Sequence, residues 1–197
     1  MTRRTLDIIF SAGALLLAGL ALVLGLVLQN QANFADDYVH DQLQAQQITF
    51  TPAAGLTEEE ASVQCLQDNA GNALVSGKQA ECYANEYIGL HLKEVNDGKT
   101  YSQTSSEARA IENQESPEAQ ELNGKVQTLF RGETLRGLLL TSYGFSIFGE
   151  RAQTAAYVCY AIALVLLLAA IAGFIHATRK SADHVILSEA ASEPVSV

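Results

Sequence analysis

Histidine and cysteine are the residue types of this sequence most able to bind a metal or act as a nucleophile, and both are scarce. The seven residues are His40, His91, His176, His184, Cys65, Cys82 and Cys159. A centre built from two histidines and one carboxylate is the metal site that such a set could form. His40 is followed directly by Asp41, and Glu94 lies three residues after His91, but neither pair stands in a recognisable ligand motif.

Other motifs of catalysis or nucleotide binding do not occur. The sequence holds no G-x-S-x-G, P-loop, G-x-G-x-x-G or C-x-x-C pattern. Asp37 and Asp41 share a helix face and could bind a divalent cation weakly, but they fit a solvated acidic face as well. The acidic residues 58–60 suit the first turn of a helix, where the dipole favours negative charge. We therefore predict a protein that is not an enzyme and has neither metal nor cofactor.

Two apolar runs are the strongest structural signal. Residues 8–28 and 154–175 contain no Asp, Glu, Lys or Arg. As helices of 1.5 Å rise per residue they would be about 32–33 Å long, which matches a hydrocarbon core of about 30 Å. Backbone polar groups in lipid must be satisfied within the segment, which requires helices. The predicted fold is all-α, with transmembrane helices over residues 8–28 and 152–176.

Basic residues beside the runs predict the topology. Arg3 and Arg4 lie in the N-terminal segment 1–7, and Arg179 and Lys180 lie in the C-terminal segment 177–197. The positive-inside rule then places both termini in the cytoplasm of a two-pass plasma-membrane protein. A cleaved signal peptide is the alternative for the first run. The run is longer than the usual 7–15 apolar residues, which favours an uncleaved signal-anchor.

The segment between the runs is strongly acidic. Residues 29–153 carry 18 acidic and 8 basic residues, a net charge of −10. This charge disfavours nucleic acid or anionic lipid as the partner of an extracytoplasmic domain. Cys65 and Cys82 both lie in this segment, whereas Cys159 lies in the second run. We predict a Cys65–Cys82 disulfide, worth about 3 kcal/mol in the chain-entropy model. Two inert or metal-binding thiols are the alternative.

Helix signals divide the predicted domain, residues 29–124. The first span is expected to continue outward as a helix with Phe34 and Tyr38 on one side, and Pro52 and Gly55 should end it. A capping box from Thr57 should open a short helix toward Leu66. A second box from Ser76 should open a longer helix that ends at Asn96. Its apolar stripe is expected at Ala80, Ala84, Tyr87, Ile88, His91 and Val95. Residues 102–115 are polar and are expected to form a linker.

An amphipathic juxtamembrane segment, residues 125–151, precedes the second run. A helix should begin at Ser116-Pro117, with Pro at its first position. The candidate surface residues are Leu129, Phe130, Leu135, Leu138, Leu139, Phe145 and Phe148. They suit a helix lying on the outer membrane surface, and equally the last core helix of the domain. Gly144 and Gly149 are expected to mark a turn into the second span.

Small residues provide candidate packing faces within the spans. They are Ala14, Ala18, Ala21 and Gly25 in the first run, with Ala169 and Gly173 in the second. Small residues let membrane helices approach closely, either within one chain or between subunits. Because a two-span protein can use one such face internally and keep another, this pattern favours assembly with a partner.

Three stretches resemble a group of small two-span actinobacterial membrane proteins without an established function. They are QLQAQQITF from Gln42, QAECYANEYIGLHLKEVNDGKTY from Gln79 and VQTLFRGETLRGLLLTSYGF from Val126. With the flanking runs, the resemblance covers most of the chain and implies two spans and an exported domain. Members are sometimes labelled aromatic ring-opening dioxygenases, but two external histidines without ligand spacing speak against that activity here.

The leading functional hypothesis is a non-catalytic accessory or scaffold subunit of a larger membrane complex, in contact with membrane lipids and a membrane-protein partner. Small two-span accessory subunits of actinobacterial respiratory supercomplexes have a similar build. The alternative is a membrane-anchored sensor or ligand-binding module. That alternative predicts a pocket beneath the helix of residues 76–95 and a mobile juxtamembrane segment.

Overall fold

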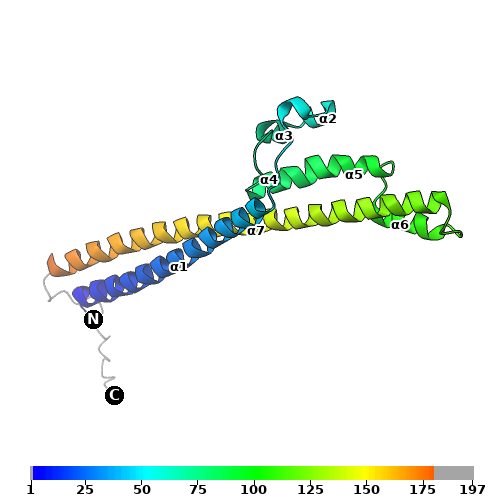
Figure 1. Cartoon of the computed structure of the whole chain (residues 1–197). Coiled ribbons are helices and arrows are strands. Elements are labelled where there is room, and N and C mark those ends of the chain that lie inside the picture. The colour runs from blue at the N-terminus through cyan, green and yellow to red at the C-terminus, as the bar shows by residue number, and fades with distance from the viewer. Residues whose placement is uncertain (1, 180–197) are drawn as a thin grey trace, which may run out of the picture. The chain divides into compact units, whose positions relative to one another are not determined.

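The computed structural model describes residues 2–179 (Figure 1), so that most of the predicted cytoplasmic tail lies outside the described part. The described chain is helical and has no strand, apart from an isolated bridge between Thr49 and Ala73. Two long helices dominate it, α1 (Arg3–Ala45) and α7 (Pro117–Arg179). Both are long and apolar enough to cross a membrane. The predicted all-helical class and the two long apolar helices are thus confirmed.

The chain divides into two compact units, to each of which α1 and α7 contribute. The helix-pair unit comprises Met1–Gln31 and Arg151–Val197, and the domain unit comprises Ala32–Glu150. In the helix-pair unit the two helices run antiparallel, with Gly25 beside Tyr160 and Gly173 beside Ser11. Only 22% of the most apolar stretch of α1 and 11% of that of α7 are buried. A core helix of a soluble protein would be mostly buried, so these helices differ from that class.

Between α1 and α7 the chain forms a series of short helices that belong to the domain unit (Figure 1). They are η1 (Ala53–Gly55), α2 (Glu58–Ala61), α3 (Gln64–Asn69), α4 (Gly77–Cys82), η2 (Tyr83–Ile88), α5 (Gly89–Val95) and α6 (Tyr101–Ala110). Phe50, Leu66, Leu74 and Leu129 are the largest apolar side chains that are fully buried in its core. Each such residue contributes about 1.5–3 kcal/mol by leaving water.

The helix predicted from Thr57 toward Leu66 is interrupted. Thr57 forms the expected capping box with Glu60, but α2 ends at Ala61 and α3 begins only at Gln64. Val63 between them is extended, with φ −96° and ψ 113°, and its side chain packs against the core. Because of this break, the apolar side chain of Val63 reaches the core. In a continuous helix it would point elsewhere.

The prediction of a linker over residues 102–115 is wrong, because α6 occupies most of this segment. Thr100 opens α6 through a capping box with Gln103. Thr104 is fully buried, and its Oγ1 accepts a hydrogen bond from Asn96 Nδ2 at 3.1 Å. The polar composition suggested solvent exposure, yet a buried hydroxyl is tolerated where a partner satisfies it.

The turn predicted at Gly144 and Gly149 is also absent, since α7 runs through both glycines without interruption. Gly149 instead allows a close approach of α1 within the domain unit. A Cβ atom at Gly149 would lie 2.9 Å from Cβ of Ala35, nearer than ordinary contact. Gly149 therefore serves helix packing, and α7 continues as a helix through this residue.

The helix predicted from Ser76 exists, but a π-helical segment lies within it. Ser76 forms its capping box with Gln79, and η2 then has i→i+5 geometry before α5 resumes. A π turn accommodates an extra residue and shifts the phase of every later residue on the helix surface. Leu92 is consequently buried, and His91, expected on the buried stripe, is exposed.

Candidate functional site

His91 is the histidine with the most contacts in the domain unit. Its side chain is 49% exposed, its Nδ1 donates to the Tyr87 carbonyl oxygen at 2.8 Å, and its Nε2 lies 3.7 Å from Glu60 Oε1. Glu60 itself is buried, and its Oε2 accepts the backbone N–H of Thr57 at 2.8 Å. The arrangement links α2 to α5 and uses both nitrogens of the imidazole ring.

No metal-binding cluster is found in the part of the chain that the structure describes. Across residues 2–179, no three His, Cys, Asp or Glu side chains are grouped so that they could hold a metal ion. His40 is exposed, and His176 lies in the helix-pair unit, 3.9 Å from Asp7. His184 lies outside the described residues.

An aromatic row follows the π-helical segment. Ring centroids are 5.2 Å apart for Phe50 and Tyr83, 4.6 Å for Tyr83 and Tyr87, and 4.5 Å for Tyr87 and His91. Burial, and then the neighbouring Tyr87, raise the pKa of the Tyr83 phenol above its usual 10.0. A raised pKa keeps this phenol neutral, which suits a packing role rather than that of a nucleophile.

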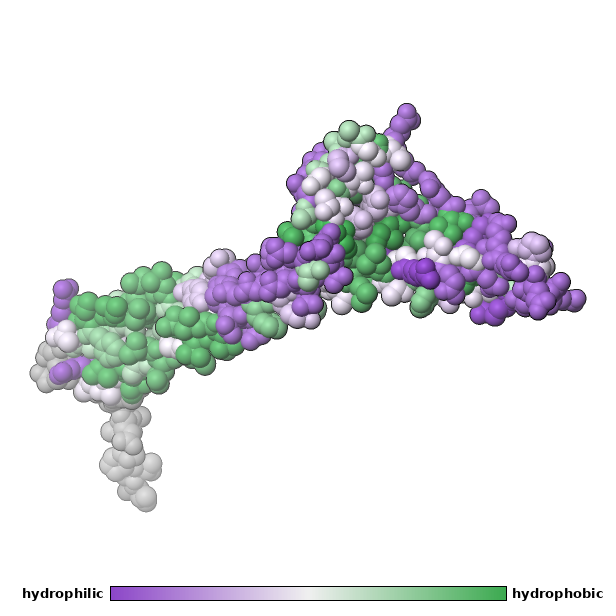
Figure 2. Space-filling view, viewed as in Figure 1, coloured by the Kyte–Doolittle hydropathy of each residue, from purple (hydrophilic) through white to green (hydrophobic). Residues whose placement is uncertain are grey.

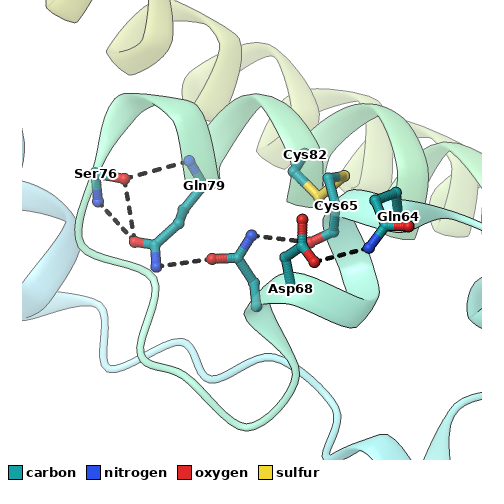
Figure 3. The surroundings of a disulfide bond; sticks show 7 residues. Gln64, Cys65, Asp68, Ser76, Gln79 and Cys82 are labelled. Carbon is teal, nitrogen blue, oxygen red and sulfur yellow. Dashed lines mark hydrogen bonds between the residues drawn. A yellow bond between two sulfur atoms is a disulfide. The ribbon is translucent and has the colours of Figure 1, made fainter.

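Cys65 of α3 and Cys82 of α4 are joined by a disulfide, with a Cα–Cα distance of 6.1 Å. Figure 3 shows the hydrogen bonds around it. Asn69 Nδ2 donates to the Cys65 carbonyl oxygen at 2.8 Å, and Gln79 Nε2 donates to Asn69 Oδ1 at 3.1 Å. Covalent and polar links thus hold α3 against α4. Beside them lies a polar groove of about 470 Å³, whose charged lining residues are Lys78, Glu81 and Glu86.

A seven-residue repeat of small residues forms the contact between the helices of the helix-pair unit. The buried positions are Ser11, Ala18 and Gly25 on α1, and Ala156, Ala163, Ala170 and Ala177 on α7. A strict seven-residue repeat keeps one seam facing the partner along a left-handed supercoil. The bulky aliphatic side chains of both helices remain on the outside (Figure 2).

Only some of the predicted packing residues are buried in this seam. Ala18 and Gly25 are buried in it, and Ala14 and Ala21 are half-buried beside it. Gly173 is half-buried and lies against Ser11, whereas Ala169 is exposed on another face. Ala169 therefore does not belong to the seam within this chain, and its role as a packing face toward another subunit stays a prediction. Small residues at i and i+4 suggested it, while the seven-residue spacing of Ala156, Ala163, Ala170 and Ala177 was the more informative signal.

The juxtamembrane residues belong to two faces of α7. Leu129 and Leu139 are buried in the core of the domain unit. Phe130, Leu135, Leu138, Phe145 and Phe148 are exposed, with Leu138 at 63% and Phe148 at 74%. The helix is thus a core helix of the domain along one side, and its other side presents apolar residues that the described chain leaves uncovered.

A groove lies beside this uncovered face, between the end of α1 and α7 within the domain unit. We call it the α1–α7 groove; its volume is about 370 Å³. Its apolar lining consists of Val39, Leu43, Ile48, Leu135, Leu138, Leu139 and Phe145. Its polar lining consists of Tyr38, Gln42, Gln46, Thr141 and Ser142. None of these residues is charged. At one end Phe145 packs edge-on against Tyr38, with ring centroids 5.7 Å apart.

Sequence reasoning identified four of these lining residues, Leu135, Leu138, Leu139 and Phe145, but did not foresee a groove. The α1 side of the groove comes from the stretch beginning at Gln42 and the residues just before it. The α7 side comes from the stretch beginning at Val126. The two stretches are far apart in the sequence, so only the tertiary structure brings them together.

Comparisons with known proteins do not assign the chain. No family model matches it, and neither the curated proteins nor the solved structures include a significant match. What the protein does must therefore be argued from its own residues and their geometry.

Proposed function

We propose that the chain is a two-pass protein of the plasma membrane that acts as a non-catalytic accessory or scaffold subunit of a larger membrane complex. The observation that carries this proposal is the distribution of side chains in the helix-pair unit. Small residues (Ala, Gly and Ser) fill the seam, and Leu, Ile, Val and Phe cover the outside. A soluble protein buries its large apolar residues, so the reverse arrangement fits an apolar solvent.

The basic residues and the disulfide support the proposed membrane topology. Arg3 and Arg4 begin α1 and Arg179 ends α7, which favours the cytoplasm for both ends. The domain unit would then lie outside. Its Cys65–Cys82 disulfide fits that side of the membrane, because disulfides persist in oxidising compartments.

The role of an accessory subunit is supported by what the exposed surfaces offer. His91 is held by Tyr87 and Glu60, so that both nitrogens of its ring already have partners. Apolar side chains such as Leu138 and Phe148 are uncovered on the domain unit as well as on the helix pair. Exposed apolar surface of this kind marks a contact with a partner or with lipid.

Co-purification after extraction in a mild detergent tests the proposal. We expect the full chain to carry one or more further membrane subunits in a fixed ratio. Gly25→Leu should lose them, because a side chain there collides with Tyr160 and separates the pair. Gly13→Leu is the matched control, since a Cβ atom at Gly13 meets nothing within 4 Å. Recovery of the chain as a solitary monomer would contradict the proposal.

The polar groove beside the disulfide favours a second candidate, a ligand-binding or sensor module. It borders α4 and η2, the helix beneath which that hypothesis predicts a pocket. A polar solute that raised the thermal stability of the chain, with the effect removed by Lys78→Ala, would support this candidate. Absence of any such solute, together with stoichiometric partner subunits, would favour the accessory role.

A further inference from the structure

The geometry points to a binding site for an uncharged, diacylglycerol-like lipid in the α1–α7 groove. This inference rests on the proposed membrane location, because only a protein at a membrane meets such a lipid at high concentration. The groove lies close in sequence to both predicted spans. Tyr38 follows Leu28 by ten residues, and Phe145 precedes Thr154 by nine.

The absence of charge from the lining is the first argument. The segment between the apolar runs has a net charge of −10, and α1 itself carries Asp37 and Asp41 among the groove residues. Neither aspartate lines the groove. An anionic headgroup would find no cation in this lining and would be repelled by the acidic surroundings. An uncharged ligand incurs neither cost.

The apolar lining is the second argument. Val39, Leu43 and Leu139 are buried, while Leu135 and Leu138 remain exposed. An alkyl chain that covered the exposed side chains would remove apolar surface from water, which is favourable in proportion to the area covered. The volume of about 370 Å³ falls within the range of small-ligand sites.

The polar lining is the third argument. The side-chain amides of Gln42 and Gln46 make no hydrogen bond within residues 2–179, so their N–H groups can donate to an ester carbonyl oxygen. Thr141 Oγ1 donates to the Gly137 carbonyl and Ser142 Oγ donates to the Leu138 carbonyl. These two hydroxyl oxygens therefore remain as acceptors for a ligand hydroxyl. Ester carbonyls and a free hydroxyl are the polar groups of a diacylglycerol.

Quenching of a single tryptophan by brominated lipid provides the test, because the sequence contains no Trp. Leu138→Trp places the reporter in the groove. Phe148→Trp is the control, an exposed position outside the groove and closer in sequence to the second span. The full chain is placed in phosphatidylcholine nanodiscs containing a small fraction of chain-brominated diacylglycerol. Parallel samples contain chain-brominated phosphatidylglycerol at the same fraction.

We expect brominated diacylglycerol to quench the Leu138→Trp protein at about five-fold lower fraction than the anionic lipid, the factor that one net hydrogen bond contributes. The Phe148→Trp protein should respond equally to both lipids. Adding Gln46→Lys to the Leu138→Trp protein should abolish the preference, because a cation in the lining attracts the anionic lipid. Gln44→Lys is the matched control, at an exposed residue of α1 outside the groove.

Other outcomes overturn the inference in distinguishable ways. Equal quenching by both lipids at Leu138→Trp would indicate general contact with the bilayer and no site. A tryptophan at residue 138 that neither lipid quenches would indicate that the groove holds no lipid, whether it faces water or is covered by a second copy or a partner protein. Either result leaves the proposed membrane function standing. Failure of the full chain to enter nanodiscs would contradict the membrane function and the lipid site together.

Discussion

Gln29 and Gln153 hold each other through two reciprocal hydrogen bonds across the helix pair. Nε2 of Gln29 donates to Oε1 of Gln153 at 2.6 Å, and Nε2 of Gln153 donates to Oε1 of Gln29 at 2.7 Å. Both residues are partly buried and border the apolar runs, directly after Leu28 and directly before Thr154. Because the amide pair closes only when the two residues face each other, it fixes the register of α1 against α7 in this unit.

The two single replacements of the pair, added together, should destabilise the helix pair more than the double replacement does. Gln153→Leu removes two hydrogen bonds and leaves the partly buried Gln29 amide without them, at a cost of about 1–3 kcal/mol. The double variant Gln29→Leu/Gln153→Leu should cost less than the sum of the single variants. A double-mutant cycle on unfolding in detergent, followed by circular dichroism, measures the coupling. Additive costs would show that the pair contributes nothing jointly.

Gly25 should tolerate no side chain while Tyr160 is present. A Cβ atom at Gly25 would lie 2.5 Å from the Tyr160 ring, so Gly25→Ala should destabilise the helix pair by about 1–3 kcal/mol. Gly19→Ala is the control, because a Cβ atom there meets nothing within 4 Å. Combining Gly25→Ala with Tyr160→Ala should restore part of the loss. Thermal unfolding in detergent compares the three proteins, and an unaffected Gly25→Ala protein would contradict the contact.

Loss of the disulfide should destabilise the domain unit selectively. The Cys65→Ser/Cys82→Ser variant loses a cross-link that closes a loop with a sequence separation of 17, worth about 3 kcal/mol. Cys159→Ser, a change at a free cysteine of the helix pair, should leave domain stability unchanged. Limited proteolysis of the 50–80 region with and without reductant is the measurement. Equal protection in both conditions would argue that the hydrogen bonds of Asn69 suffice.

The stability of the domain unit should fall at alkaline pH because of Tyr83. Burial and the neighbouring Tyr87 raise the folded-state pKa of Tyr83 above the unfolded value of 10.0, so the unfolded chain loses this proton first. The contribution is fully present below pH 10.0 and is lost as pH rises through the folded pKa. Tyr83→Phe should flatten the alkaline loss of thermal stability. Ultraviolet absorbance of tyrosinate follows the titration, and an unchanged alkaline profile in Tyr83→Phe would contradict the assignment.

Local signals made the helix starts predictable. The capping boxes at Thr57 and Ser76 and the Pro117 start depend on residues within one turn, and the structure has all three. Helix α6 was missed because its buried Thr104 is satisfied by Asn96, a partner that composition does not reveal. The π-helical segment could not be predicted because no residue type marks it. It changes only which residues of the helix face the core, so that Leu92 faces inward and His91 outward.

The candidate groove could be predicted only in part. The amphipathic pattern of residues 125–151 identified apolar residues on α7, but it could not separate the buried Leu139 from the exposed Leu138. That separation depends on where α1 and α5 pack. Likewise, the lining of the groove is uncharged because of which side chains of α1 face α7. The sequence alone could not predict this, because Asp37 and Asp41 are direct neighbours in the sequence of lining residues of α1.

The seam of small residues bears on how the helix pair would form in a bilayer. Because Ala18, Gly25, Ala156 and Ala163 remove so little apolar surface from their surroundings, each helix would be stable in lipid before it meets the other. Insertion and pairing would then be separate stages of biosynthesis, the first driven by hydropathy and the second by close fit. Variants such as Gly25→Ala would reach the membrane in normal amounts and fail only at the second stage.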